Sequence, residues 1–393
     1  MKIGIDALTL VPGNTGGVET YINNLIKNIA TIDTQYEYLV FALPQAADAL
    51  SFGHKNIQVN VCRMSAIKGL NTCLRVLYQQ LVLPGKIKRL DIDVMIFTSN
   101  IGCLRCPCPS LLIIHDLIRH YCAANLPGQI GYVREKILPA LIGASARAVT
   151  RIAAISEFTK QDIINRLAIP AEKIEVVHNG VDENLRGTAS NCNGKNILSK
   201  IKQPYILFVG YHHPHKNLVR LVQAFVMMKD RTRISHALII AGRKEAGTQA
   251  LMREVHSHNR RDIFVLGAVS SDELLELYKG ASLFVLPSLI EGFGLPLLEA
   301  MSFGVPIAAS NAGSIPEVVG DAAVLFDPED VNSMANTVEM ALLDRKLSQH
   351  LVKKGYARVR ETGSFSWHAA AKKILALAEE ISEQPSVGFT LVH

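Results

Sequence analysis

Short apolar runs recur along the whole chain, and segments with the periodicity of helices separate them. Runs such as VMIFTSN, SLLIIHD, YILFVG and HALIIAG are largely apolar, which is typical of parallel strands buried on both faces. Residues 18–29 and 218–225 instead repeat their apolar side chains at helical spacing. Strands that alternate with helices in this way predict an α/β protein with two doubly wound domains.

A polar segment divides this pattern into two halves. RGTASNCNGKNILSK, which starts at Arg186, is rich in glycine, asparagine and serine and therefore predicts a linker. We expect a Rossmann-like domain over 1–185, a linker over 186–203, a second Rossmann-like domain over 204–365, and a C-terminal helix over 366–393 that returns to the first domain. Doubly wound sheets bind ligands beyond the carboxyl ends of their strands, so we expect the two domains to present these edges to a cleft.

Composition narrows the class of protein. The 393 residues are 49% apolar and 19% charged, which is typical of a globular chain. Lys and Arg exceed Asp and Glu by 18 to 15 in residues 1–185 and by 23 to 20 in the rest, so neither half has the concentrated basic surface of a nucleic-acid binder. The N-terminal MKIGIDALTLVPG lacks a small-residue cleavage site and predicts a strand rather than a signal peptide.

The location expected from the sequence is the cytoplasm. Seven cysteines form an odd number without regular spacing, which favours a reducing compartment. No apolar stretch reaches the roughly 18 residues of a transmembrane helix. A peripheral contact with the inner membrane stays open. The segment NTCLRVLYQQLVLPGKIKRL mixes apolar and basic residues, but a core helix with a solvated basic end is the favoured interpretation.

Three segments resemble metal sites, and we favour a structural interpretation for each. Cys103, Cys106 and Cys108 have only His115 as a nearby fourth ligand, so we expect free thiols. The acidic DID at 91–93 precedes a predicted strand, as a strand-start cap would. In HHPH, three histidines share a four-residue turn and rarely converge on one ion. We therefore expect no metal.

The stretch EGFGLPLLE carries the clearest candidate chemistry. It follows a predicted strand and opens a predicted helix, so the backbone amides of Phe293, Gly294 and Leu295 are expected to point at anionic oxygens. Glu299, one turn into the helix, is placed to accept hydrogen bonds from the hydroxyls of a ribose. Glu291 projects from the other end of the loop. This pattern indicates a ligand that carries both phosphate and sugar hydroxyls, although either carboxylate alone would more often be solvated or cap a helix.

This stretch resembles the E-x7-E signature of retaining glycosyltransferases of family 4, which have the GT-B fold. The segments GNTGGVETYINNL, IIHDL, PYILFVGYHHPHKNL and ASNAGSIPEVVGDAAVLFDP follow in the order of that family. The detailed sequence of these segments resembles the branch of bacterial mannosyltransferases that assemble O-antigen and capsule. The resemblance implies metal-independent transfer of a hexose from a nucleotide sugar, with no further cofactor, to a glycan or polyprenol-linked glycan. Mannose from GDP-mannose is the first expectation, and UDP-glucose or dTDP-rhamnose are alternatives.

The resemblance also implies roles for single residues. Gly16 and Gly17 would open the first helix toward the donor diphosphate or the acceptor, although an ordinary βα turn would look the same. His115, at a strand end, would approach the hydroxyls of the donor sugar, and Asp116 would orient neighbouring loops. Lys216, at the start of a helix, would bind the diphosphate.

The chain departs from the family at the phosphate site. The family commonly has an arginine after the glycine of this strand or directly before the lysine, whereas this chain has Tyr211 after Gly210 and His215 before Lys216. A cationic His215 would substitute in part, with a charge that depends on pH. Trp367 is expected to pack where the last helix crosses back to the first domain.

Three other functions fit parts of the sequence. A nonhydrolysing nucleotide-sugar epimerase shares the two-domain architecture but has no need of the E-x7-E loop. A nicotinamide dehydrogenase needs G-x-G-x-x-G after a strand, and PGNTGG has the wrong spacing. A non-catalytic subunit that binds nucleotide sugars is favoured only by the departure at Tyr211.

Overall fold

The computed structural model describes residues 1–13, 16–33, 35–50, 52–64, 71–125, 136–181, 201–360, 363 and 365–383. The chain divides into two compact units. Unit 1 comprises Met1–Gly180 together with the segment from Trp367 onward, and unit 2 comprises Val181–Ser366. Most of the expected linker, residues 186–200, lies outside the described residues.

Unit 1 contains a parallel sheet of seven strands, in the order β3-β2-β1-β4-β5-β6-β7. The order reverses between β1 and β4, which are neighbours at the centre of the sheet. In chain order the strands are β1 (Lys2–Asp6), β2 (Glu37–Ala42), β3 (Ile57–Val61), β4 (Val94–Phe97), β5 (Ser110–Ile114), β6 (Arg151–Ala154) and β7 (Ile174–Val176).

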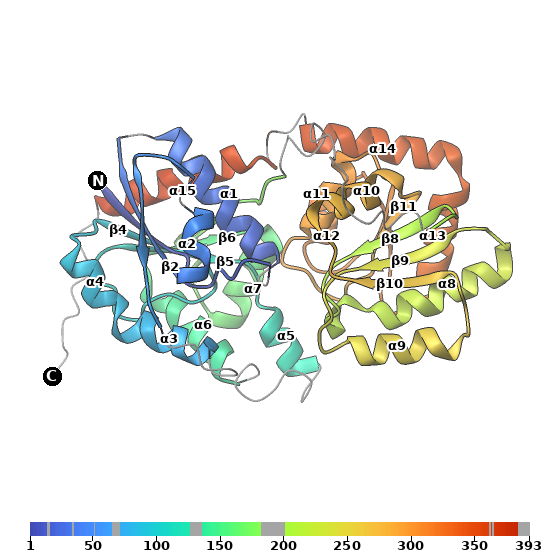
Figure 1. The fold of residues 1–393 in the computed structure, drawn as a ribbon, viewed down its shortest axis with the longest axis horizontal. Helices are drawn as coiled ribbons and strands as arrows, with labels where there is room; N and C mark the ends of the chain where they lie inside the picture. The colour runs from blue at the N-terminus through green and yellow to red at the C-terminus, as the bar shows by residue number, and fades with distance from the viewer. Residues whose placement is uncertain are drawn as a thin grey trace. The chain divides into compact units, whose positions relative to one another are not determined.

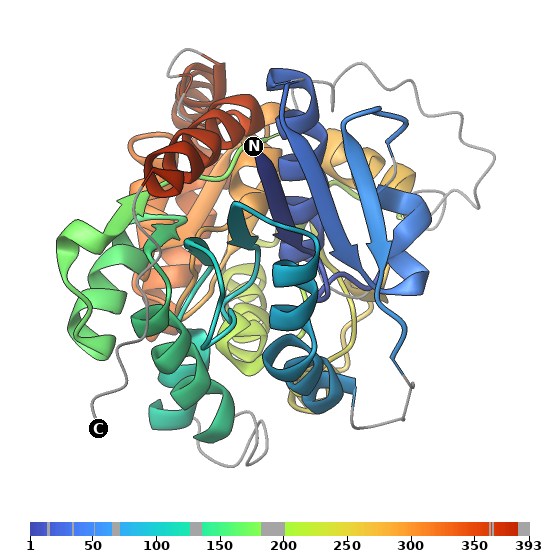
Figure 2. The ribbon, with the colours of Figure 1, turned by 90° about the vertical axis from the view of Figure 1, so that its left-hand side faces the viewer.

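Helices cover both faces of this sheet (Figure 2). They are α1 (Gly17–Ile32), α2 (Pro44–Ala47), α3 (Asn71–Leu81), α4 (Leu83–Arg89), α5 (Ile118–Asn125), α6 (Leu138–Ala148), α7 (Glu157–Leu167) and α15 (Trp367–Ser382). Alternate strand residues such as Met95 and Phe97 join one core cluster with apolar side chains of α4, α6 and α7. On the other face, α15 packs against α1 and the central strands (Figure 1).

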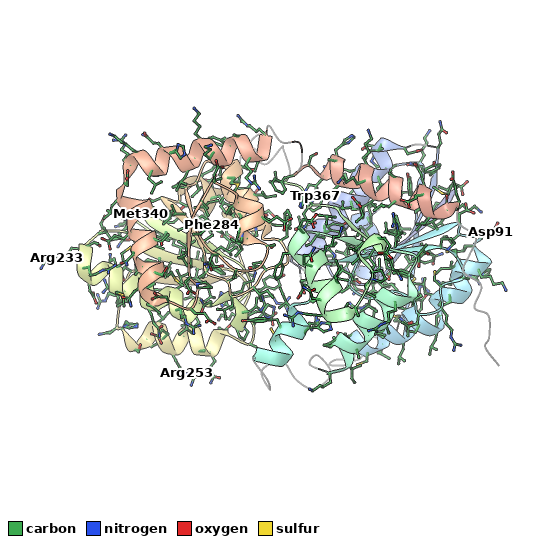
Figure 3. The ribbon with its side chains drawn as sticks, turned by 180° about the vertical axis from the view of Figure 1, so that it is seen from behind. Asp91, Arg233, Arg253, Phe284, Met340 and Trp367 are labelled. Carbon is green, nitrogen blue, oxygen red and sulfur yellow. The ribbon has the colours of Figure 1, made fainter. Side chains whose placement is uncertain are left out.

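Unit 2 contains a parallel sheet of six strands, in the order β10-β9-β8-β11-β12-β13. The strands are β8 (Tyr205–Val209), β9 (Ala237–Ala241), β10 (Ile263–Gly267), β11 (Leu283–Leu286), β12 (Ile307–Ser310) and β13 (Val324–Phe326). The helices are α8 (Leu218–Thr232), α9 (Thr248–Ser257), α10 (Ser271–Gly280), α11 (Leu295–Ser302), α12 (Ile315–Val319), α13 (Val331–Leu343) and α14 (Arg345–Arg360). The four central strands are almost entirely buried, and Phe284 of β11 lies in the interior (Figure 3).

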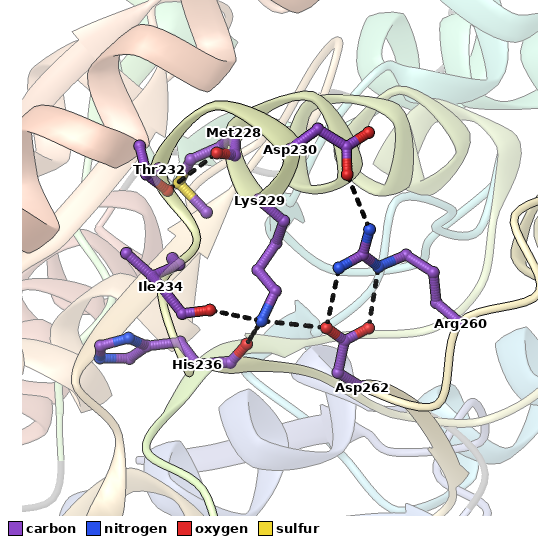
Figure 4. Close-up of polar contacts among 8 residues, drawn as sticks. All are labelled: Met228, Lys229, Asp230, Thr232, Ile234, His236, Arg260 and Asp262. Carbon is purple, nitrogen blue, oxygen red and sulfur yellow. Dashed lines mark hydrogen bonds and ion pairs between the residues drawn. The ribbon is translucent and has the colours of Figure 1, made fainter.

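A network of ion pairs and hydrogen bonds lies at the amino-terminal edge of this second sheet (Figure 4). Asp262, just before β10, pairs with Lys229 at 3.0 Å and with Arg260 at 3.1 Å. Lys229 Nζ also donates to the backbone carbonyls of Ile234 and His236, which lead into β9. The network ties the end of α8 to two strands, at the sheet edge opposite to the carboxyl ends where ligands of such folds bind.

The predicted fold class is confirmed in each unit. The short apolar runs form parallel strands, and helices bury both faces of each sheet. The last described helix, α15, belongs to unit 1 and begins at Trp367, whose ring meets that of Tyr21 edge-on at 5.6 Å. No helix in the described part of the chain combines the length and the apolar composition needed to cross a bilayer.

Candidate functional site

The loops that follow β8 and β11 carry the two central charged residues of the site. These strands are neighbours at the centre of the unit 2 sheet, where the strand order reverses. A reversal of this kind leaves a crevice at the carboxyl ends of the strands, because the loops on its two sides run in opposite directions. Lys216 follows β8 and Glu291 follows β11, so the fold brings together two residues far apart in the sequence.

Lys216 and Glu291 form an ion pair. Lys216 Nζ lies 2.5 Å from Glu291 Oε1, and the Ser288 hydroxyl donates to the same oxygen at 2.6 Å. The side chain of Glu291 is 8% exposed and that of Lys216 is 17% exposed, so water screens the pair only weakly. In this arrangement the two charges balance, and the carboxylate is held in one orientation by two donors.

The backbone around Glu291 is fixed by the loop after β12. The amide and the hydroxyl of Ser314 both donate to the Glu291 carbonyl oxygen, at 3.2 and 3.1 Å. Gly313 has a φ of +62°, and a Cβ added there would lie 2.7 Å from the Glu291 nitrogen. Only glycine therefore lets these two loops approach so closely.

The loop that carries Lys216 differs from its prediction. Lys216 ends a short 3-10 turn, Pro214–Lys216, and α8 begins two residues later at Leu218. The reason is Asn217, which adopts a left-handed conformation with a φ of +60°. Its side-chain amide donates to the carbonyls of Pro287 and Pro328, at 3.0 and 2.7 Å, and so ties this turn to the end of β11.

His215 is not positioned to act as a substitute cation. Its side chain is buried, its ring stacks on that of His213 at 5.4 Å, and Lys216 follows it in the chain. Burial first, and then the neighbouring Lys216 and His213, lower the pKa of His215 well below its ordinary value. The lowered pKa favours a neutral imidazole near pH 7, which argues against the expectation that a cationic His215 would substitute in part for the missing arginine.

The predicted glycine-rich helix start is present after Glu291. Gly294 forms the N-cap of α11 with a φ of +99°, and an added Cβ would lie 2.9 Å from Leu297 Cδ1. The ring of Phe293 is buried and meets Phe365 edge-on at 5.8 Å. The amides of Phe293, Gly294 and Leu295 lie at this helix start, where backbone donors and the helix dipole favour an anion, and their role as anion donors stays a prediction.

Glu299 lies in the second turn of α11 beside Tyr278 of α10. The Tyr278 hydroxyl donates to Glu299 Oε2 at 2.7 Å, and the Tyr278 ring stacks on Phe303 at 5.6 Å. Burial raises the pKa of Glu299, while the Tyr278 hydrogen bond opposes this effect.

Tyr278 and Ser288, which orient the two glutamates, were not predicted. Of these two residues, only Ser288 could have been noticed from the sequence, because it lies three residues before Glu291 and just after a predicted strand.

In unit 1, His115 follows β5 at the carboxyl edge of the sheet. Its Nε2 lies 2.8 Å from the Thr98 carbonyl oxygen, its amide donates to Asn100 Oδ1, and the Tyr21 ring meets it edge-on at 4.8 Å. Burial lowers the pKa of His115, so the ring is neutral near pH 7. A carbonyl only accepts, so Nε2 carries the proton and Nδ1 keeps a lone pair that can accept a hydrogen bond from a hydroxyl.

The remaining predicted residues of unit 1 flank the same edge. Gly16 is the N-cap of α1 with a φ of +53°, and Gly17 begins the helix, as expected for a glycine turn. Asp116 Oδ1 accepts the Ile118 amide at 3.0 Å, and the Asp116 carbonyl accepts from Asn100, so this residue does orient its loop.

Asp6, which no sequence signal singled out, ends β1 at this edge. Its carboxylate is buried and accepts from the Leu8 amide at 2.9 Å and from Gln79 Nε2 at 2.5 Å. Burial raises the pKa of Asp6 to about 6, although the Leu8 amide, Gln79 and the charge of Arg75 oppose this effect.

Two of the three segments that resemble metal sites, the DID segment and the cysteine segment, lie in unit 1 and make contacts within the protein. Asp93 Oδ2 accepts the backbone amide of Lys2 at the start of β1. The Cys106 and Cys108 sulfurs are 3.9 Å apart, and Cys103 is buried. Within the described ranges, no group of three or more His, Cys, Asp or Glu side chains is placed to hold a metal ion.

Comparison with known proteins gives a consistent assignment. The family model "Glycosyltransferase Family 4" matches residues 15–185, and "Glycosyl transferases group 1" matches residues 194–358. O-antigen chain mannosyltransferase B of Escherichia coli is 32% identical over 259 residues, which are 64% of this chain and 65% of that protein. The serotype-specific mannosyltransferase WbdA of Escherichia coli is 27% identical over 307 residues, or 75% of this chain and 37% of that protein.

The chain thus spans less than two thirds of the length of either relative. Among solved structures, HepE of Anabaena in complex with UDP-glucose superposes with a TM-score of 0.73 at 18% identity, over 97% of this chain and 100% of that one. This likeness concerns the fold, and the two family models together extend across both units. The chain belongs to the family 4 glycosyltransferases, with a Family 4 domain followed by a group 1 domain on the GT-B fold.

Proposed function

We propose that the protein is a metal-independent, retaining hexosyltransferase of bacterial surface polysaccharide synthesis. The donor is a nucleotide diphosphate sugar, with GDP-mannose as the first candidate because the relatives matched over much of the chain are named mannosyltransferases. The acceptor is a glycan or a polyprenol-linked glycan.

The observation that carries this proposal is the Lys216–Glu291 pair beside the start of α11, at the strand-order reversal of unit 2. A cation beside a helix start suits a diphosphate, whereas two carboxylates held by hydroxyl donors suit sugar hydroxyls. Glu299 is assigned to the ribose and Glu291 to the transferred sugar. In unit 1, the Nδ1 lone pair of His115 suits a sugar hydroxyl.

The proposed reaction is a front-face substitution. The bond between the anomeric carbon and the diphosphate oxygen breaks, the acceptor oxygen bonds to that carbon on the same face, and the acceptor proton moves to the leaving phosphate oxygen. Double displacement would need a carboxylate nucleophile at the anomeric carbon. Glu291 is instead engaged by Lys216 and Ser288. Catalysis then rests on positioning and on stabilising the charge that develops on the diphosphate.

A surface of unit 1 supports the peripheral membrane contact. At the end of α3 and the start of α4, Leu77, Leu81 and Val82 are 53%, 74% and 44% exposed. The last turn of α4 adds Lys86, Lys88 and Arg89. Exposed leucines beside basic residues suit an anionic lipid surface. Co-sedimentation with anionic vesicles should therefore fall in Leu81→Asp.

The decisive experiment is a panel of nucleotide sugars tested by thermal unfolding and then by transfer. A donor at about 100 times its dissociation constant should stabilise the protein by roughly 2.7 kcal/mol. The donor that stabilises is then offered with polyprenol-linked acceptors, and NMR of the product should show the anomeric configuration of the donor. Transfer should survive EDTA. An inverted product, or activity that returns only when a divalent metal is restored, contradicts the corresponding part of the proposal.

A non-catalytic subunit is the second candidate, because Lys216 is already neutralised and no cation directly precedes it. It predicts binding of a nucleotide sugar without transfer or donor hydrolysis in the same panel.

A further inference from the structure

The charge on a donor diphosphate is not balanced by Lys216 alone, since this lysine is paired with Glu291 at 2.5 Å. His215 adds no charge near pH 7, because burial lowers its pKa. Another cation at the carboxyl ends of the central strands of unit 2 would therefore complete the phosphate site of the proposed function, on which this inference rests.

The loops after β8 and β9 leave the sheet side by side, and two glycines make this possible. A Cβ on Gly242, whose φ is +148°, would overlap the carbonyl oxygen of Gly210. The Gly210 amide donates to Ala241 at 2.9 Å, and the His212 amide donates to the carbonyl of Arg243 at 3.0 Å. The residues after Gly210 and Gly242 are consequently held next to each other.

This pairing places Arg243 on the ring of Tyr211. Arg243 Cζ lies 5.9 Å from the centroid of the Tyr211 ring, within the range of a cation–π contact. The Nε edge of the guanidinium faces Glu245 Oε1 at 3.5 Å, a weak surface pair. The side chain of Arg243 is 39% exposed, so solutes can reach it.

The same segment lies next to Lys216. A Cβ built on Gly210 would lie 3.9 Å from Lys216 Cε, so the lysine side chain passes over the residue that precedes Tyr211. Both cations therefore border the short segment at Gly210 and Tyr211, where β8 ends. Lys216 reaches it from the turn before α8, and Arg243 reaches it from the end of β9.

We propose that Arg243 is the second cation that binds the phosphates of the donor, and that Tyr211 is the positioning residue that holds its guanidinium over the end of β8. A guanidinium offers two parallel donors to phosphate oxygens, which a lysine does not. The Tyr211 ring then has a function of its own, because its face orients the guanidinium of Arg243, which follows the neighbouring strand β9.

The test measures binding of GDP and of UDP to the 393-residue chain by titration calorimetry, with GMP and UMP as ligands that lack the second phosphate. Arg243→Ala should weaken binding of the preferred diphosphate about 10- to 100-fold and that of the monophosphate less. Arg243→Lys should recover only part of the loss. Arg253→Ala removes an exposed arginine from α9 of the same unit (Figure 3), as a matched charge control, and should bind as the wild type does.

Tyr211 is tested by conservative and disruptive variants. Tyr211→Phe keeps the aromatic face and should bind the diphosphate as the wild type does, whereas Tyr211→Leu should weaken it several-fold with an unchanged unfolding temperature. A purely structural tyrosine would give the opposite pattern, a lower unfolding temperature with unchanged affinity.

The outcomes separate this inference from the proposed function. Wild-type protein that binds neither diphosphate overturns both. Normal binding by the wild type with an unchanged dissociation constant in Arg243→Ala overturns the inference alone. An equal loss for mono- and diphosphate also overturns it, because Arg243 would then act on the nucleoside or on the fold.

Discussion

At the scale of single residues, the charged side chains of the site are already paired with each other. Glu291 Oε1 accepts from both Lys216 and Ser288, so the cation best placed for a phosphate is already occupied by a carboxylate. An incoming diphosphate must share or replace Glu291 as the partner of Lys216. Two roles of Lys216, stabilising a mostly buried carboxylate and binding phosphate, can therefore be separated by mutation.

We expect Lys216→Ala to lower both the stability of unit 2 and the rate of transfer. Removing one partner of a buried pair leaves an uncompensated charge and costs about 3 kcal/mol of unfolding free energy. The double variant Lys216→Ala/Glu291→Gln should regain that stability, as measured by thermal unfolding. Its affinity for the nucleoside diphosphate should nonetheless stay low, because the phosphate-binding cation is missing. Recovery of that affinity along with stability would give Lys216 a structural role only.

The two glutamates should respond differently to neutralisation. Glu291→Gln removes the competitor for Lys216, so affinity for the nucleoside diphosphate should hold or rise while transfer falls. Glu299→Gln should weaken donor and free nucleotide alike, because it acts in ground and transition states equally. Calorimetry of both variants, together with initial rates, measures the difference. Tyr278→Phe is the control, since it deprives Glu299 of its hydrogen bond without removing the carboxylate.

A covalent role for Glu291 would produce a different observation. Wild-type protein incubated with donor alone would then gain the mass of one hexose in intact-mass spectrometry, located on Glu291. Such an adduct would replace front-face attack with double displacement.

The sequence predicted the charged members of this site better than their partners. Lys216 and Glu291 stand in recognisable segments, but Ser288 and Tyr278 became evident only from contacts that the fold creates. The neutral state of His215 could not be predicted either, because its pKa is set by burial, which a local motif does not reveal.

At the scale of elements, close packing between loops positions the site. The loop after β12 lies against the loop after β11, and Gly313 provides the room for this contact. The run of parallel strands was predictable from apolar segments. The turn before α8 was not, because the left-handed Asn217 is stabilised by carbonyls from segments far along the chain.

Gly313→Ala should therefore disturb catalysis as well as folding. The new methyl group would press on the Glu291 backbone nitrogen and oxygen, at 2.7 and 2.8 Å, and displace the carboxylate. Gly267→Ala is the matched control, since Gly267 also has a positive φ, +75°, but an added Cβ meets nothing within 4 Å. Gly267→Ala should lose about 1 kcal/mol of stability from backbone strain, and Gly313→Ala should lose more, because its methyl group also meets backbone atoms. Only Gly313→Ala should lose transfer by 10-fold or more, and equal rates would refute the coupling.

At the scale of the whole molecule, the two units have separate cores and can be followed separately. The only tryptophan of the chain, Trp367, belongs to unit 1 and packs on Tyr21. Its fluorescence therefore reports the unfolding of unit 1, whereas circular dichroism reports both units. The general division into two α/β units followed from the sequence, but the buried Asp6 in unit 1 did not.

Asp6 should make the stability of unit 1 depend on pH. Its pKa in the folded state is about 6, above the ordinary 3.8, so between these values the folded state holds a proton that the unfolded state has lost. Stability is therefore greatest below about pH 4 for this group and falls as pH rises to about 6, by roughly 3 kcal/mol. Urea unfolding followed by Trp367 fluorescence should show this loss in the difference between wild type and Asp6→Asn. A difference that is constant with pH would contradict it.

The position of α15 has a consequence for synthesis on the ribosome. This helix covers α1 and the central strands of unit 1, yet all of unit 2 is translated before it. At roughly 5–20 residues per second, unit 2 occupies the ribosome for on the order of 10–40 s. Throughout that interval the nascent unit 1 exposes the apolar face that Trp367 and α15 later bury. We expect the nascent chain to depend on a chaperone at this stage, and a chain released before Trp367 to aggregate even though every residue of the donor site has been made.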